Sequence, residues 1–161
     1  MVSEGTMFDW SGVYFESVVQ PGPGLVQMGY VAFMSTMALG RFTADRMVMR
    51  FGPVRVLRAS GILIASGLLV SVLFPMLWSA TLGFLLVGFG TSSISMAGKS
   101  KKMIPSVALA SVSTIGFLGF LLGPPVIGHI AHASSLRWSF SLIALVGLGT
   151  AFIAPFLKKF R

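Results

Sequence analysis

The stretch SGILIASGLLVSVLFPMLW, Ser60–Trp78, decides the fold class, because it contains no charged residue. A helix that crosses the hydrocarbon core of a bilayer needs roughly 20 mostly apolar residues. Ala80–Gly98 and Trp138–Leu157 are also free of charge, and Ile104–Gly128 is a fourth, longer stretch of the same kind. These stretches predict an all-α membrane protein.

Two weaker segments precede these four. Leu25–Gly40 is short, but Arg41 extends it if its guanidinium group snorkels to the headgroups. Met1–Val19 carries three acids and begins abruptly, so we expect it to be the end of a truncated first helix. One domain, residues 1–161, is therefore expected to hold six helices, at 1–19, 25–42, 59–78, 80–98, 104–130 and 138–157.

The composition points to lipid as the main solvent of this chain. Of 161 residues, 55% are hydrophobic and only 10% are charged, and the mean hydropathy is +0.89. The net charge of +8 would suggest nucleic acid on a soluble protein, but the basic residues form short clusters between apolar runs, so we expect no nucleic-acid partner. There is no cysteine, and two histidines are too few for a metal site, so neither a metal nor a cofactor is expected.

The basic residues also predict the orientation in the membrane. Cytoplasmic loops are rich in Lys and Arg, and only Arg137 falls on the other side of the predicted topology. An even number of spans then places both termini in the cytoplasm, and we expect a bacterial inner (plasma) membrane. The residues assigned to the cytoplasmic side are Arg41, Arg46, Arg50, Arg55, Arg58, Lys99, Lys101, Lys102, Lys158, Lys159 and Arg161.

The motif GRFTADRMVMRFG, Gly40–Gly52, lies in the first predicted basic loop. Gly40 permits close approach of another helix, and Gly52 frees the backbone to turn. Asp45 is able to pair with Arg50 or to accept from a helix amino terminus. A generic basic loop would explain the arginines but not one acid flanked by glycines at this spacing.

The motif resembles the G-x-x-x-[AG]-D-R-x-x-x-[RK]-x-G signature of the major facilitator superfamily of transporters. In that family the signature recurs between the second and third helices of each six-helix half. The resemblance implies a structural or gating role, in which Asp45 locks a closed conformation. That role would extend to the other anchor and basic positions of the motif, which are Gly40, Arg41, Arg46, Arg50 and Gly52.

A second motif, GFLLGPPVIG, spans Gly119–Gly128 in the long fifth segment. Gly119 and Gly123 share one helix face, where the missing side chains permit close backbone contact. Pro124 and Pro125 remove backbone donors and favour bending. With Gly128, these residues are predicted to serve helix packing and bending, and they resemble the glycine-proline pattern of certain facilitator families.

The amino-terminal run EGTMFDWS, Glu4–Ser11, together with the Gly-Pro-Pro run, resembles the YbjJ-like and rhizopine-membrane-protein (MosC)-like branch of the superfamily. This resemblance covers essentially the whole chain. It implies the carboxy-terminal half of a twelve-helix transporter, helices seven to twelve, with the start of helix seven missing. Transport would then need a second six-helix half, as a separate chain, as missing sequence or through a homodimer.

Two acids of the first segment are candidates for a functional role. An acid inside a span is costly, so Glu4 and Asp9 are candidates for substrate contact or proton coupling. An interhelical hydrogen bond or a water-exposed helix end is an equal alternative. Hydroxyl residues such as Thr91, Ser92 and Ser93 either line a polar cavity or, more commonly, bond to their own helix backbone.

The favoured function is transport of a small solute across the lipid bilayer by a gradient-driven secondary transporter with alternating access. No phosphate-cradling loop or ordered nucleophile is present, so no enzyme is expected. A truncated, non-transporting remnant and an accessory or structural membrane protein are the alternatives.

Overall fold

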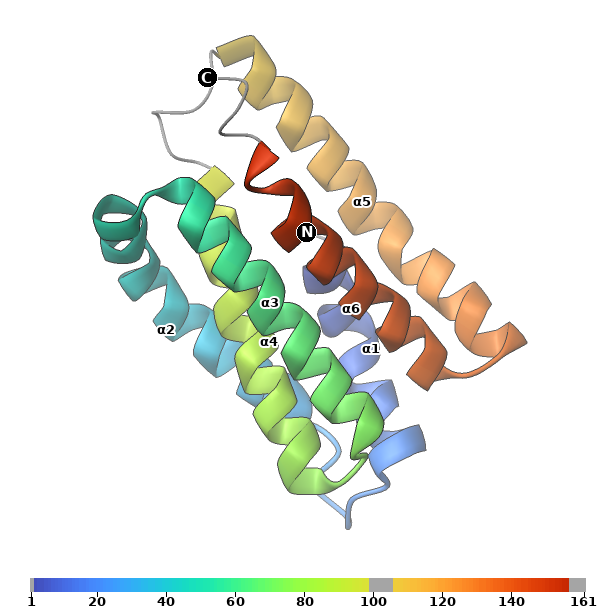
Figure 1. The fold of residues 1–161 in the computed structure, drawn as a ribbon. Coiled ribbons are helices and arrows are strands. Elements are labelled where there is room, and N and C mark those ends of the chain that lie inside the picture. The colour runs from blue at the N-terminus through green and yellow to red at the C-terminus, as the bar shows by residue number, and fades with distance from the viewer. Residues whose placement is uncertain (1, 99–105, 157–161) are drawn as a thin grey trace.

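The computed structural model describes residues 2–98 and 106–156, and this part of the chain is a bundle of helices without strands (Figure 1). The Lys and Arg residues expected on the cytoplasmic side at 99–102 and 158–161 lie outside the described residues. The elements in chain order are α1 (Val2–Tyr14), the π-helical segment η1 (Phe15–Val19), α2 (Met28–Phe51), α3 (Pro53–Leu73), α4 (Leu77–Gly98), α5 (Ser106–Ala133) and α6 (Leu136–Ile153).

Four helices of the described residues are long and apolar enough to cross a membrane: Pro53–Leu73, Leu77–Ile94, Thr114–Ala133 and Leu136–Ile153. Each overlaps one of the four charge-free stretches that predicted spans, although Pro53–Leu73 also includes Arg55 and Arg58, and Leu136–Ile153 includes Arg137. Helix α1 has only 13 residues, and α2 carries several charges in its second half. The all-α membrane architecture is therefore confirmed, with α1 and α2 less apolar than the other helices.

The predicted first basic loop is wrong, because nearly all of it is helix. Helix α2 begins at Met28 and continues through Phe51, well past the predicted end at residue 42. Residues 41–51 contain no Gly or Pro, so the helix stops only at Gly52, where φ is +83°, and α3 starts at once with Pro53. The motif therefore forms the last turns of α2 and a one-residue corner.

The other turn next to α2 forms near the predicted Pro-Gly sequence. The segment η1 ends at Val19 and is capped by Gln20, which has a left-handed φ of +49° and whose N–H donates to the Phe15 carbonyl at 2.8 Å. Two further turns precede the start of α2 at Met28, and so the predicted span start at residue 25 is three residues early.

Close helix contacts at glycines determine how the bundle packs. Helix α4 lies against both α2 and α3, and α6 lies against the other side of α3. A Cβ atom on Gly61 of α3 would come within 2.6 Å of the Gly147 carbonyl oxygen of α6. A Cβ atom on Gly67 of α3 would likewise come within 2.5 Å of the Gly83 carbonyl oxygen of α4. Small residues at these contacts allow the backbones to approach, which is how membrane helices associate.

An aromatic cluster fills the core at the end opposite the α2–α3 corner. Tyr14, Phe84 and Phe140 are fully buried, and the Tyr14 and Phe140 ring centroids are 4.5 Å apart. The Tyr14 hydroxyl donates to the Ser71 carbonyl at 2.6 Å, and the Arg137 guanidinium donates to the Val72 carbonyl at 2.7 Å. These bonds satisfy carbonyls near the carboxyl end of α3.

We expect Gly52→Ala to destabilise the protein, because a side chain at φ +83° and ψ 155° is strained by about 1–3 kcal/mol. Gly12→Ala is the matched control, since Gly12 lies within α1 and nothing stands within 4 Å of its added Cβ. Unfolding by sodium dodecyl sulfate in mixed micelles, followed by circular dichroism, compares the two. Equal midpoints for both variants would contradict the strained corner.

Candidate functional site

Gly40 begins the family motif at a close contact between α2 and α4. A Cβ atom on Gly40 would collide with the Ser92 side chain of α4. The roughly three turns of α2 that follow carry the motif's charges, and Arg41, Asp45 and Arg46 are all exposed. The small residue thus fixes α2 on α4 and leaves the charged side chains outside the six-helix bundle.

The pairing of Asp45 with Arg50 that the sequence suggested is absent among the described residues. Because this segment is helical, residues five positions apart point about 140° from each other. The Arg50 guanidinium instead lies over the Phe51 ring, 5.5 Å from its centroid. Asp45 therefore faces outward without an ion pair to its own bundle in the described part of the chain.

Arg41 contacts an acid that is distant in the sequence. Its Nη2 atom lies 3.8 Å from Oε1 of Glu4, and their side chains are 58% and 13% exposed. This ion pair joins α1 to α2 and explains how the mostly covered Glu4 carboxylate is tolerated. The sequence reasoning missed the pair, because no local spacing relates residues on two different helices.

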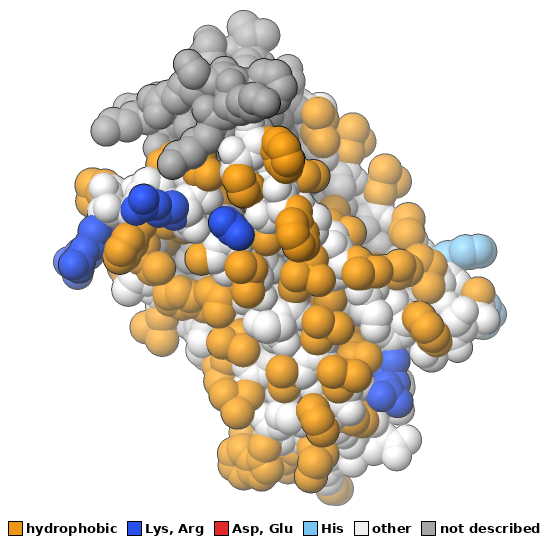
Figure 2. Space-filling model, viewed as in Figure 1, with side chains coloured by type: hydrophobic (Ala, Val, Ile, Leu, Met, Phe, Trp, Pro, Cys, Tyr) orange, Lys and Arg blue, Asp and Glu red, His pale blue; other side chains and the backbone are white. Residues whose placement is uncertain are grey.

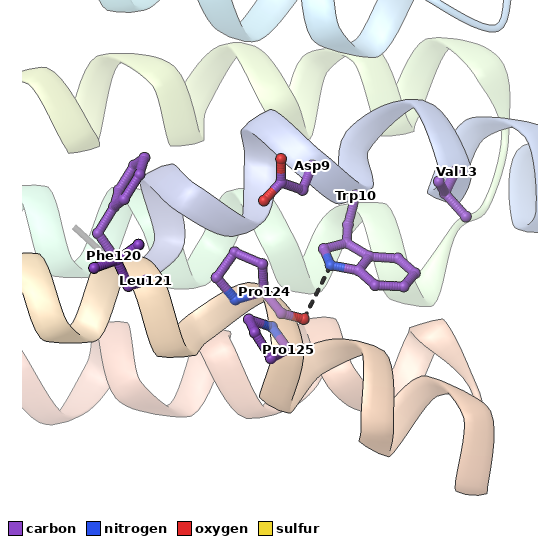
Figure 3. Close-up of a pocket in the computed structure, with 7 residues that line it drawn as sticks. All are labelled: Asp9, Trp10, Val13, Phe120, Leu121, Pro124 and Pro125. Atoms are coloured by element: carbon purple, nitrogen blue, oxygen red, sulfur yellow. Dashed lines mark hydrogen bonds between the residues drawn. The ribbon is translucent and has the colours of Figure 1, made fainter.

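Asp9, the other candidate acid, is exposed and borders a cavity of about 460 Å³ between α1 and α5. Figure 3 shows its carboxylate pointing from α1 into the space beside Pro124. The lining residues are Asp9, Trp10 and Val13 of α1 and Phe120, Leu121, Pro124 and Pro125 of α5. The structure thus brings Asp9 and the proline pair of α5 together at one cavity.

The proline pair changes the hydrogen bonding of α5 beside this cavity. Pro124 and Pro125 lie inside the helix and cannot donate to the carbonyls of Phe120 and Leu121, four positions earlier. The Phe120 oxygen faces α1, since it would be 2.8 Å from a Cβ atom on Gly5. One turn further along, the Trp10 indole Nε1–H donates to the Pro124 carbonyl at 3.2 Å, which links the two helices.

The glycines of the second motif lie at the same interface. A Cβ atom on Gly119 would come within 2.9 Å of the Val2 side chain, and a Cβ atom on Gly123 would come within 3.2 Å of it. At Gly128 it would come within 2.8 Å of the Trp10 ring. These three positions let α1 pack closely along α5, on both sides of the cavity.

The hydroxyl residues of α4 do not line this cavity. Thr91, Ser92 and Ser93 are buried, and each donates to a carbonyl three or four positions earlier in α4. Their hydroxyl groups are thus satisfied by their own helix. The described residues also contain no group of three or more His, Cys, Asp or Glu that could hold a metal ion.

The surface separates charge from apolar area. Figure 2 shows Lys and Arg side chains gathered where α2 meets α3, while hydrophobic side chains are spread over most of the rest of the face in view. Arg137 lies at the far end, where it contacts the carboxyl end of α3. This distribution matches a body whose sides face hydrocarbon and whose basic end faces a charged headgroup layer.

Comparison with known proteins identifies relatives along the whole chain. It is 37% identical over 155 residues to an uncharacterised MFS-type transporter of Yersinia pestis, covering 93% of the chain and 40% of that protein. It is 34% identical over 163 residues to the uncharacterised transporter y4wD of Sinorhizobium fredii, covering 98% and 43%. It is 32% identical over 166 residues to the membrane protein MosC of Rhizobium meliloti, covering 100% and 41%.

No family model and no solved structure matches the chain. The helical bundle and its apolar spans define a polytopic integral membrane protein. With relatives of this kind along its length, the resemblance of the chain to the major facilitator superfamily, and to its MosC-like branch, is confirmed. The chain spans 40–43% of the length of these three relatives, which fits a six-helix half of a twelve-helix fold.

We expect Trp10→Phe to loosen α1 from α5, because it removes the indole donor to the Pro124 carbonyl and keeps an aromatic ring. Hydrogen bonds between membrane helices contribute about 0.6 kcal/mol on average. Trp78→Phe is the control, since Trp78 is 73% exposed. Hydrogen exchange of α1 amides should rise in Trp10→Phe alone. Unchanged exchange in both variants would show that the bond does not hold α1.

Proposed function

We propose that this chain is the carboxy-terminal six-helix half of a secondary transporter, which moves a small solute across the bilayer by alternating access. The observation that carries the proposal is its similarity, along the whole chain, to an MFS-type transporter that is more than twice as long. Transport is driven by an ion gradient, with protons as the proposed coupling ion. The membrane is the bacterial inner membrane, with both termini on the cytoplasmic side.

The partner in this proposal is a second six-helix half. Helix α5 supports it, because only 11% of the span Thr114–Ala133 is buried within the bundle. Helix α5 packs against α1 and more weakly against α6, and so most of its surface is free to contact another bundle or lipid. The second half is a separate chain, sequence beyond this chain, or a second copy of it.

The outward-facing charges at the end of α2 are proposed as the gating element of this half. Asp45 is exposed and has no ion pair among the described residues, so its carboxylate is available to a helix of the second half. Arg46 and Arg50 are exposed on the same segment. Contacts made only in one orientation of the halves would bias the equilibrium between inward-open and outward-open states.

Glu4 and Asp9 have different proposed roles. Glu4 is paired with Arg41 across α1 and α2, so protonation of its carboxylate would release that contact. This makes Glu4 the better candidate for proton coupling. Asp9 borders the cavity between α1 and α5 and has no ion pair there, so it is the better candidate for solute contact.

The direct test is solute uptake into proteoliposomes under an imposed proton gradient. The chain is reconstituted alone and together with the amino-terminal half of its Yersinia pestis relative, and a panel of labelled small solutes is screened. We expect uptake only with both halves. Uptake by the chain alone would indicate a homodimer, and no uptake in either case would favour a non-transporting remnant or an accessory protein.

In the complete system we expect Asp45→Asn to lower uptake roughly tenfold, which corresponds to about 1.4 kcal/mol of conformational bias. Glu16→Gln is the control, since it removes one exposed acid of η1, outside the motif. Initial uptake rates at equal reconstituted protein provide the comparison. An Asp45→Asn rate equal to that of the wild type would refute the gating role.

A further inference from the structure

The cavity between α1 and α5 contains a carboxylate without a cation from its own bundle. Asp9 borders the cavity and makes no ion pair within the described residues. Neither α1 nor α5 has a Lys or Arg anywhere in its sequence. A carboxylate at a membrane helix is costly unless it has water or a positive partner. Asp9 is exposed, so water can satisfy it, and a cation that enters the cavity meets no competing Lys or Arg on either helix.

The polar atoms around Asp9 are almost all hydrogen-bond acceptors. Because Pro124 and Pro125 have no N–H, the carbonyls of Phe120 and Leu121 lose their usual donors beside the cavity. The side-chain donor of the lining, the Trp10 indole N–H, is already bonded to the Pro124 carbonyl. A ligand that fits this lining must supply both the donors and the positive charge.

The apolar part of the lining is suited to the carbon skeleton of such a ligand. The rings of Trp10 and Phe120 border the cavity on its two helices, and aromatic faces attract organic cations. Val13 and Leu121 add aliphatic surface. A cavity of about 460 Å³ lies within the range of small-molecule sites, of about 300–1,000 Å³.

We propose that this cavity binds the ammonium group of a small organic cation, with Asp9 as its counter-ion. The Leu121 carbonyl accepts a hydrogen bond from the ammonium, and the Trp10 and Phe120 rings contact the carbon skeleton. The inference rests on the proposed function in taking the cavity as a solute site, and it names the chemical class of that solute.

The test measures binding and requires no transport. The full chain is purified in detergent with Trp78→Phe and Trp138→Phe, two tryptophans that are 73% and 67% exposed and lie outside the cavity. Trp10 is then the single indole and reports on the cavity by its fluorescence. The probes are cyclohexylammonium and cyclohexanol, which share a ring but differ in charge, and both are also titrated into protein-free micelles that contain a tryptophan analogue.

We expect cyclohexylammonium to quench Trp10 emission saturably and cyclohexanol to bind about tenfold or more weakly. Asp9→Asn should remove this preference, whereas Glu16→Gln, which removes an acid outside the cavity, should keep it. Equal binding of the two probes by the single-tryptophan chain with Asp9 intact would overturn the proposal. An Asp9→Asn chain that still prefers the ammonium would overturn it as well.

The outcomes separate this site from the proposed transport function. Ammonium binding without solute uptake by the two-half system would leave the site in place and contradict the transporter. Uptake of solutes with no preference for ammonium at the cavity would contradict the site and leave the transporter in place.

Discussion

Close backbone contact between helices is the constraint on which the rest of this structure depends. Lipid chains are as apolar as the side chains of the bundle, so burial from water does not drive these helices together once they are in the membrane. The contacts of Gly61 with Gly147 and of Gly67 with Gly83 bring α3 against α6 and α4. Gly40 then fixes α2 on α4, and with it the position of the family motif.

The pairing of α1 with α5 follows the same rule with one difference. Gly119, Gly123 and Gly128 allow the two helices to pack closely. Between Gly123 and Gly128, Pro124 and Pro125 have no backbone N–H to donate. The carbonyls that lose their donors, the Trp10 bond and the Asp9 carboxylate therefore meet in one place. The site is a consequence of how this pair packs, because its polar atoms come from the interruption of α5.

Hydropathy predicted the four apolar spans well, since the bilayer sets both their length and their lack of charge. It failed at the end of α2, because a run of charges was taken for a loop although residues 41–51 contain no helix breaker. The Glu4–Arg41 pair and the meeting of Asp9 with Pro124 depend on which helices are neighbours. Nearly uniform apolar helices carry little directional pattern, so the sequence did not reveal those neighbours.

A solute site at the α1–α5 cavity requires that the cavity face water, unlike the sides of the bundle that face lipid. The chain contains no cysteine, so single cysteines are introduced at Leu121 in the cavity lining or at Leu145, which is 61% exposed on α6 and outside that cavity. Labelling in membranes with a charged, water-soluble maleimide is the measurement. The account predicts rapid labelling of Leu121→Cys and little of Leu145→Cys. Equal labelling of both, or none at Leu121→Cys, would contradict it.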